Sequence, residues 1–152
     1  MLVIQRMKQE DLRQVLDIEQ TCFKAPWTEE QFLYEVNDNP FCTILLIKDN
    51  DLICGYLDFW TTFETATICK IAVRPEYRRN KYAFKLMEKA FELMKQQEVE
   101  TVTLEVRVSN EGAIRFYESI GFIKVTIKPH YYDDGEDAYY MVKGGTDIWD
   151  KK

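Results

Sequence analysis

The feature that most constrains this chain is a strand, a basic turn and a helix that follow one another between Ile71 and Met87. Residues 71–73 are apolar and typical of the end of a strand, and Pro75 cannot continue a central strand. The first N–H groups of a helix lack intrahelical partners, and the helix dipole is positive at that end. A strand, a turn and a helix start in this order are therefore suited to binding phosphate. The turn itself carries Arg78, Arg79, Asn80 and Lys81.

The turn matches neither of the two common glycine-rich phosphate loops. It lacks the G-K-[ST] of a Walker loop, and it contains no glycine of a dinucleotide fingerprint. What remains is a cationic cradle at a helix N-terminus, or, as the alternative, an ordinary solvated helix start.

Length and charge limit the remaining possibilities. The length of 152 residues and a hydrophobic share of 46% predict one domain, residues 1–143, followed by a polar tail, residues 144–152. The net charge of −6 argues against a nucleic-acid partner, which requires a basic face. We find no signal sequence and no apolar run of about 20 residues, so we expect a cytoplasmic protein without a membrane segment. The four cysteines are expected as free thiols, and with His130 as the only histidine no metal is predicted.

Hydrophobic periodicity predicts a mixed α/β sheet with helices packed against it. At the second helix, Thr28 and Gln31 predict a capping box, and Trp27 and Phe32 fall at the positions of a hydrophobic staple. Gly121 is expected as the cap that ends the last helix. The expected strands are 2–6, 41–48, 52–62, 64–73, 101–108, 122–128 and 138–143, and the expected helices are 10–23, 28–37, 82–97 and 110–120.

Two motifs resemble the cofactor motifs of the GCN5-related N-acetyltransferases (GNAT superfamily). Residues 73–83, V-R-P-E-Y-R-R-N-K-Y-A, are similar to its pyrophosphate loop R/Q-x-x-G-x-G/A, with Arg78 in the first place and Ala83 in the last. Residues 110–122, N-E-G-A-I-R-F-Y-E-S-I-G-F, are similar to N-x-x-A-x-x-[FL]-Y-x-x-x-G-F. Three further patches, at 25–32, 103–107 and 131–141, are similar to the ribosomal-protein-alanine N-acetyltransferases (RimI type).

The resemblance implies a fold, a cofactor and a set of site residues. The fold would be that of the acyl-CoA N-acyltransferases, a central, mostly antiparallel mixed sheet flanked by about four helices, and the cofactor would be acetyl-CoA. By this resemblance Glu105 is the general base and Tyr117 is the acid that protonates the leaving thiolate. The residues expected to bind the cofactor are Ile71, Ala72, Val73, Arg78, Arg79, Asn80, Lys81, Tyr82, Ala83, Phe84 and Asn110.

Ordinary structural roles stay open for several of these residues. Glu105 could instead be an ordinary strand carboxylate that pairs with a cation of a neighbouring strand. Tyr117 lies on an apolar stripe and suits a core aromatic, and Asn110 suits a helix N-cap. Five residues could line a peptide channel or simply form rim aromatics and a solvated hairpin tip: Trp27, Tyr131, Tyr132, Glu136 and Asp137.

One residue departs from the family pattern. Lys81 stands where the loop normally has glycine. If that position requires a positive φ, a lysine there is strained by about 1 kcal/mol or more. The departure bears on cofactor affinity rather than on cofactor identity.

The function that the resemblance implies is acetyl transfer from acetyl-CoA to a protein N-terminus, such as the N-terminal alanine of a small-subunit ribosomal protein. An α-amino group needs only ~1 kcal/mol to lose its proton at pH 7, whereas lysine needs ~4.6 kcal/mol. A single carboxylate base therefore favours N-terminal acetylation. The alternatives are an acetyltransferase for protein lysine or a small amine, and, in another class, a catalytically weak acetyl-CoA-binding or interaction module. We expect a monomer or weak dimer.

Overall fold

The structure, a computed structural model, describes residues 1–147. Two compact units emerge: unit 1 comprises Met1–Thr61 and Cys69–Ala90, and unit 2 comprises Thr62–Ile68 and, of the described residues, 91–147. Strand β4 (Thr65–Val73) contributes to both units within a seven-stranded sheet of order β1-β2-β3-β4-β5-β7-β6. The predicted mixed α/β class is confirmed, while the single domain stays a prediction.

Every predicted strand and helix is present in the described residues, with boundaries shifted by one or two residues. The one added element before the first helix is the 3₁₀ turn η1 (Gln9–Asp11), in which a side-chain oxygen of Asp11 accepts the N–H of Lys8 at 2.9 Å. The other strands are β1 (Leu2–Arg6), β2 (Cys42–Asp49), β3 (Leu52–Thr62), β5 (Thr101–Arg107), β6 (Ile123–Lys128) and β7 (Ala138–Gly144). The helices are α1 (Leu12–Cys22), α2 (Glu29–Asn37), α3 (Tyr82–Gln96) and α4 (Glu111–Ser119), with a second 3₁₀ turn, η2 (Pro75–Tyr77).

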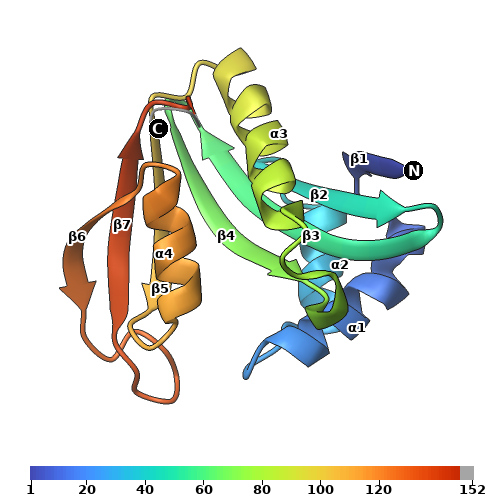
Figure 1. Cartoon of the computed structure of the whole chain (residues 1–152), viewed down its shortest axis with the longest axis horizontal. Coiled ribbons are helices and arrows are strands. Elements are labelled where there is room, and N and C mark those ends of the chain that lie inside the picture. The colour runs from blue at the N-terminus through green and yellow to red at the C-terminus, as the bar shows by residue number, and fades with distance from the viewer. Residues whose placement is uncertain (148–152) are drawn as a thin grey trace. The chain divides into compact units, whose positions relative to one another are not determined.

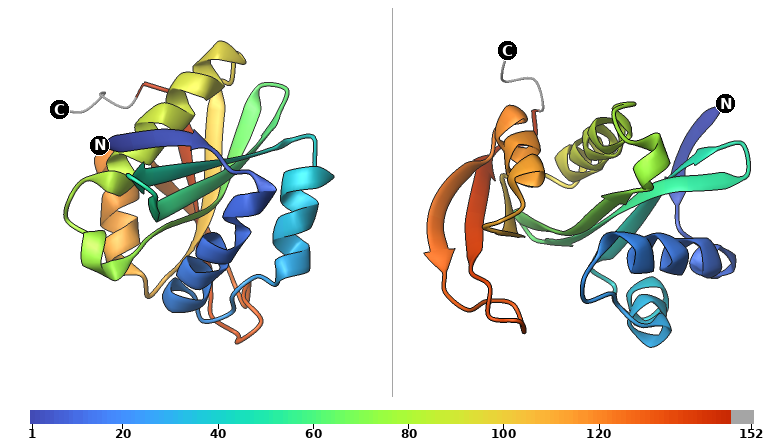
Figure 2. Two further views of the ribbon diagram at one scale, coloured as in Figure 1. Left: turned by 90° about the vertical axis from the view of Figure 1, so that its right-hand side faces the viewer. Right: turned by 60° about the horizontal axis from the view of Figure 1, so that its bottom comes forward.

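In unit 1, strands β1, β2 and β3 pair antiparallel, and helices α1 and α2 cover one face of the sheet (Figure 1). The part of α3 that belongs to this unit lies on the opposite face (Figure 2). Apolar side chains from both layers form one buried cluster, which includes Val15 and Ile18 of α1, Phe32 of α2, and Ile44 and Tyr56 of the sheet. Burial of these apolar side chains holds α1 and α2 against this face of the sheet.

The start of α2 has the predicted geometry. The Thr28 hydroxyl accepts the N–H of Gln31 at 3.2 Å, and the Gln31 side chain accepts the N–H of Thr28 at 2.7 Å. The rings of Trp27 and Phe32 lie 5.2 Å apart. The capping box and the staple are therefore confirmed, and together they fix the direction in which the chain enters α2.

Unit 2 is built around β5. Residues 65–68 of β4 pair with residues 101–104 of β5 in parallel, and β7 joins β5 and β6 by antiparallel pairing. Helix α4 buries Tyr117, and the rings of Tyr117 and Phe122 lie 5.8 Å apart. Gly121, the expected helix cap, has a φ of +110°. In the expected tail, the N–H of Gly145 donates to Glu100 O at 2.7 Å, while residues 148–152 lie outside the described residues.

Candidate active site

The basic turn of unit 1 is held by its own side chains. Arg78 Nε donates to Val73 O, the last carbonyl of β4, at 3.1 Å. Asn80 Nδ2 donates to Tyr77 O at 3.1 Å, and the rings of Tyr77 and Tyr82 stack 6.1 Å apart. Arg78 thus braces the end of β4 against the turn, which is a structural role that the sequence did not indicate.

The backbone of this turn contains two left-handed residues. The φ angles are +69° at Arg79 and +63° at Lys81. Lys81 therefore has a left-handed backbone conformation, which glycine adopts without strain. For a residue with a side chain this conformation costs about 1–2 kcal/mol. Left-handed residues between right-handed or extended neighbours turn successive N–H groups toward one side, which favours an anion.

The chemistry of the turn fits a diphosphate. Arg79, Asn80 and Lys81 are exposed, and they directly precede the first turn of α3. Tyr82, Ala83 and Phe84, which form that first turn, are half-buried. Cationic side chains, left-handed backbone and the positive end of a helix of 15 residues converge on one segment, so these residues suit a bound pyrophosphate group.

The strand before the turn approaches β3 very closely. A Cβ placed on Gly55 of β3 would stand 2.6 Å from Ala72 O. Ala72 and Val73 are buried, and Ile71 is half-buried. Gly55 therefore permits the close strand contact that sets the position of residues 71–73.

The segment that carries Trp27 is tied to a buried carboxylate of α1. Glu19 is fully buried. Its Oε2 accepts a hydrogen bond from the Trp27 N–H at 2.8 Å and another from the Lys70 ammonium at 2.6 Å. Its Oε1 accepts a short hydrogen bond from the hydroxyl of Tyr56. The Lys70 ammonium also lies over the rings of Phe23 and Trp27, 4.1 and 4.9 Å from their centroids. Sequence reasoning missed this cluster, although Glu19 falls on the apolar stripe of its helix.

The candidate base Glu105 belongs to unit 2. It lies on β5 opposite Tyr140 of β7. Its Oε2 accepts a hydrogen bond at 2.7 Å from the ammonium of Lys128, which lies on β6. Lys128 also stands over the Tyr140 ring, 4.7 Å from its centroid. The hydrogen bond to Glu105 raises the pKa of Lys128. The carboxylate therefore has a cross-strand cation, but this cation comes from β6, which β7 separates from β5, and not from a neighbouring strand as the ordinary structural role predicted.

Tyr117 and Asn110 lie at the two ends of α4. Asn110 Oδ1 accepts the N–H of Ala113 at 3.2 Å, so the predicted N-cap is confirmed. Tyr117 is buried beside Phe116 and Phe122. Burial raises its pKa, with a smaller contribution from Tyr132, so its hydroxyl keeps its proton near neutral pH and has that proton to give.

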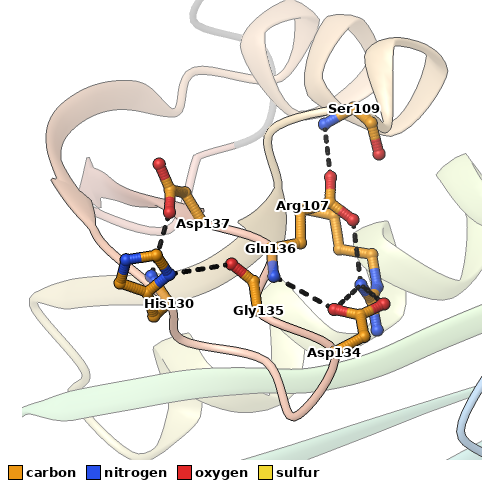
Figure 3. A network of polar contacts seen from close by, with 7 residues as sticks. All are labelled: Arg107, Ser109, His130, Asp134, Gly135, Glu136 and Asp137. Atoms are coloured by element: carbon orange, nitrogen blue, oxygen red, sulfur yellow. Dashed lines mark hydrogen bonds and ion pairs between the residues drawn. The ribbon is translucent and has the colours of Figure 1, made fainter.

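The acidic turn between β6 and β7 is organised by Arg107 of β5 (Figure 3). Arg107 Nη1 lies 2.9 Å from a carboxylate oxygen of Asp134 and 2.9 Å from Glu136 Oε1, while Glu136 Oε2 accepts the N–H of Ser109 at 3.0 Å. Hydrogen bonds from Ser109, and then from Arg107, lower the pKa of Glu136 to about 2. Glu136 therefore builds the turn, whatever further role it has toward a substrate.

The aromatic residues of the same turn lie beside these cations. The Arg107 guanidinium stands 4.1 Å from the ring centroid of Tyr132, and the rings of Tyr131 and Tyr132 meet edge to face at 5.0 Å. Asp137 accepts the N–H of His130 at 2.9 Å, as Figure 3 shows. Arg107 thus contacts both the acidic side chains and an aromatic ring of this turn, a role that the sequence did not indicate, while the role of Tyr131 and Tyr132 toward a peptide stays a prediction.

Residues 12–122 match the sequence profile of the acetyltransferase (GNAT) family. The chain belongs to the GNAT family. The match covers well over half of the chain and includes the basic turn, β5 and α4. The family resemblance carried by residues 73–83 and 110–122 is therefore confirmed.

Individual GNAT relatives cover nearly the whole chain. A Bacillus subtilis (strain 168) protein, named as a candidate ribosomal protein bS18-alanine N-acetyltransferase, is 37% identical over 139 residues, which cover 91% of this chain and 92% of the relative. The ribosomal protein bS18-alanine N-acetyltransferase of Escherichia coli (strain K12) is 33% identical over 144 residues, covering 93% and 96%.

Solved structures agree with this assignment. The crystal structure of the Escherichia coli ribosomal-protein-S18-alanine N-acetyltransferase has a TM-score of 0.86 at 32% identity, and covers 95% of this chain and 94% of its own. Ard1 from Thermoplasma volcanium has a TM-score of 0.89 at 27% identity, with 95% and 97% covered. The predicted GNAT fold is confirmed. Among residues 1–147, no helix combines the length and the apolar character that crossing a membrane requires.

Proposed function

We propose that this protein transfers acetyl from acetyl-CoA to the α-amino group of a protein N-terminus, in particular the N-terminal alanine of a small-subunit ribosomal protein. The observation that carries this proposal is the identity of 33% to a named ribosomal protein bS18-alanine N-acetyltransferase over 93% of this chain. The substrate would be met in the cytoplasm, where ribosomal proteins are made.

The basic turn supports acetyl-CoA as the donor, which supplies a thioester-bound acetyl group when it is bound. Arg79, Lys81 and the first N–H groups of α3 would hold its pyrophosphate. Arg78 keeps the end of β4 in place through its bond to Val73 O at 3.1 Å. The backbone of residues 71–73 would then be available to orient the pantetheine arm.

Glu105 would take the proton of the attacking amine, and Tyr117 would return a proton to the leaving thiolate. Glu105 is paired with Lys128. It could accept a proton from the substrate only after the substrate ammonium has replaced the Lys128 ammonium. The α-amino group of a peptide carries the same charge as Lys128 and has a pKa of about 7.7–8.0, so its proton can pass to a carboxylate at modest cost. Trp27, Tyr131 and Tyr132 would contact the first residues of the peptide.

The test compares three peptides with the same sequence, which begins with alanine and contains one internal lysine. The first has a free N-terminus, the second has a blocked N-terminus, and the third has the lysine replaced by glutamine. With acetyl-CoA, mass spectrometry should find acetyl on the N-terminus of the first and third peptides only. Acetylation of the blocked peptide at an equal rate would instead support a lysine acetyltransferase, and acetyl-CoA binding without turnover would support the binding module.

The roles of the two candidate catalytic residues are tested by single variants. Glu105→Gln and Tyr117→Phe should each lower kcat by about 10²–10⁴-fold, as is usual for the loss of a general acid or base. Acetyl-CoA binding, measured separately by calorimetry, should stay unchanged. Glu118→Gln on the exposed side of α4 is the matched control. If both variants keep the wild-type kcat across the pH range, the two assignments are wrong.

A further inference from the structure

Three potential metal ligands meet in unit 1, on the α2 side of the sheet. They are Glu35 of α2, Cys42 of β2 and Asp58 of β3, and one ligand atom from each lies within 4.8 Å of the others. Glu35 is 4% exposed and Asp58 is 0% exposed. The cluster is separate from the basic turn and contains none of the residues assigned above to acetyl transfer.

Asp58 lacks the partners that a buried carboxylate needs. Its Oδ1 accepts the thiol of Cys42 at 3.2 Å, whereas its Oδ2 has no hydrogen-bond partner among residues 1–147. Lys70 lies close enough to act on Asp58, but its ammonium is already paired with Glu19 at 2.6 Å. A fully buried carboxylate oxygen without a partner, on a side chain whose other oxygen already contacts a cluster member, calls for a cation or a proton.

We propose that Glu35, Cys42 and Asp58 bind a thiophilic divalent cation of the Zn²⁺ or Co²⁺ type. Around a tetrahedral zinc ion, with bonds of about 2.0–2.3 Å, ligand atoms stand roughly 3–4 Å apart, so small side-chain rotations close the site. A thiolate with two carboxylates suits borderline metals and disfavours Ca²⁺ and Mg²⁺, which take oxygen ligands only. The sequence analysis predicted no metal because the chain has a single histidine, and this proposal departs from that prediction, since the cluster contains no histidine.

The surroundings of Glu35 are those of an oriented metal ligand. Trp60 Nε1 donates to Glu35 Oε1 at 2.6 Å, and Asn39 Nδ2 donates to Glu35 Oε2 at 3.0 Å. Each oxygen keeps a second lone pair for a metal, and such outer partners fix the ligand's direction. Glu35 and Trp60 also line an open pocket of about 330 Å³, together with Trp27 and Tyr34. Of the three proposed ligands Glu35 lines this pocket, so the ion would enter from the side of Glu35.

Binding is a simple exchange of protons for metal. The Cys42 thiol loses its proton, any proton held by Asp58 is released as well, and both pass to solvent while bonds form from sulfur and carboxylate oxygen to the metal. No oxidant or reductant takes part. The bound ion would tie α2 to β2 and β3, which makes its role structural, and this inference holds whether or not the proposed acetyl transfer does.

The experiment titrates the chelator-treated, full-length protein with Co²⁺ and then with Zn²⁺. We expect one equivalent of Co²⁺ to produce a thiolate-to-cobalt charge-transfer band, which Zn²⁺ then removes. Cys42→Ser should abolish the band, and Asp58→Asn, which has the same shape, should weaken Zn²⁺ binding by roughly tenfold or more. Cys54→Ser, at a buried thiol outside the cluster, is the control and should keep both properties.

Circular dichroism confirms that each variant is folded before it is titrated. The proposal is overturned if the folded wild-type protein gives no charge-transfer band at stoichiometric Co²⁺. It is equally overturned if Cys42→Ser or Asp58→Asn binds Zn²⁺ as tightly as the wild-type protein. The first outcome would mean that the two carboxylates share a proton instead, and the second that Zn²⁺ binds elsewhere on the chain.

Discussion

The buried Glu19–Lys70 pair permits a quantitative prediction. Replacing Glu19 by glutamine keeps the shape of the side chain but removes the carboxylate that pairs directly with the Lys70 ammonium at 2.6 Å. Lys70 is only 12% exposed, so water cannot replace the lost partner. Breaking one side of a buried ion pair typically costs about 3–5 kcal/mol. We therefore expect the free energy of unfolding to fall by about this amount.

The reverse change should cost less. In Lys70→Met, Glu19 still accepts hydrogen bonds from the Tyr56 hydroxyl and the Trp27 N–H, one at each carboxylate oxygen. In the double variant Glu19→Gln/Lys70→Met no charge is left unpaired. Its stability should return to within about 1–2 kcal/mol of the wild type, since replacing both partners is far less costly than removing one.

Urea unfolding followed by circular dichroism measures all four proteins of this double-mutant cycle. For a chain of this size a loss of 3–5 kcal/mol corresponds to a fall of roughly 6–20 °C in Tm. The expected coupling energy is about 2 kcal/mol or more, within the range for residues in contact. A loss below about 1 kcal/mol for Glu19→Gln, or additive effects of the two changes, would refute the reasoning, because the ammonium would then have another partner or ready access to water.

Four further outcomes are expected. Lys81→Gly should relieve about 1–2 kcal/mol of left-handed strain but lose about 0.4–1 kcal/mol through unfolded-state entropy, so Tm should rise by up to about 6 °C, and a fall would contradict the strain. Gly55→Ala should destabilise the fold and weaken acetyl-CoA binding in calorimetry, because the added Cβ would stand 2.6 Å from a β4 carbonyl oxygen. Lys128→Met should lower the peptide KM by about two- to fivefold, since an exposed pair worth up to ~1 kcal/mol no longer competes for Glu105; an unchanged KM would argue against exchange. Glu136, whose folded pKa is about 2, stabilises the turn above its ordinary pKa near 4.5, so this stability should fade as the pH drops from 4.5 to 2, and Glu136→Gln should remove that part of an acid titration.

The predictions that succeeded rest on local rules. The capping box at Thr28 and Gln31 depends on residues three apart, and the Asn110 cap depends on the same spacing. The basic turn was recognisable for the same reason, since its strand, its turn and its helix start are consecutive in the chain.

The missed contacts join residues that only the sheet order brings together. Lys70 meets Glu19 across 51 positions of the sequence, and Lys128 meets Glu105 across 23. The second pair spans two strands, since β7 lies between β5 and β6. Periodicity gives the face of a residue but not the order of the strands, so it could suggest that Glu105 has a cationic neighbour without identifying Lys128.

The two lysines occupy environments of the same kind, and their exposure separates their roles. Lys70 pairs with a carboxylate beside the rings of Phe23 and Trp27, and Lys128 pairs with Glu105 beside the ring of Tyr140. A carboxylate flanked by aromatic faces also suits the ammonium of a peptide N-terminus. An ammonium that is 12% exposed, as in Lys70, cannot leave without unpairing a fully buried acid, whereas Lys128 is 41% exposed and can swing into water. Exchange with a substrate amine is therefore expected at Glu105 and not at Glu19, which keeps the Glu19 cluster as the fixed support of the Trp27 segment.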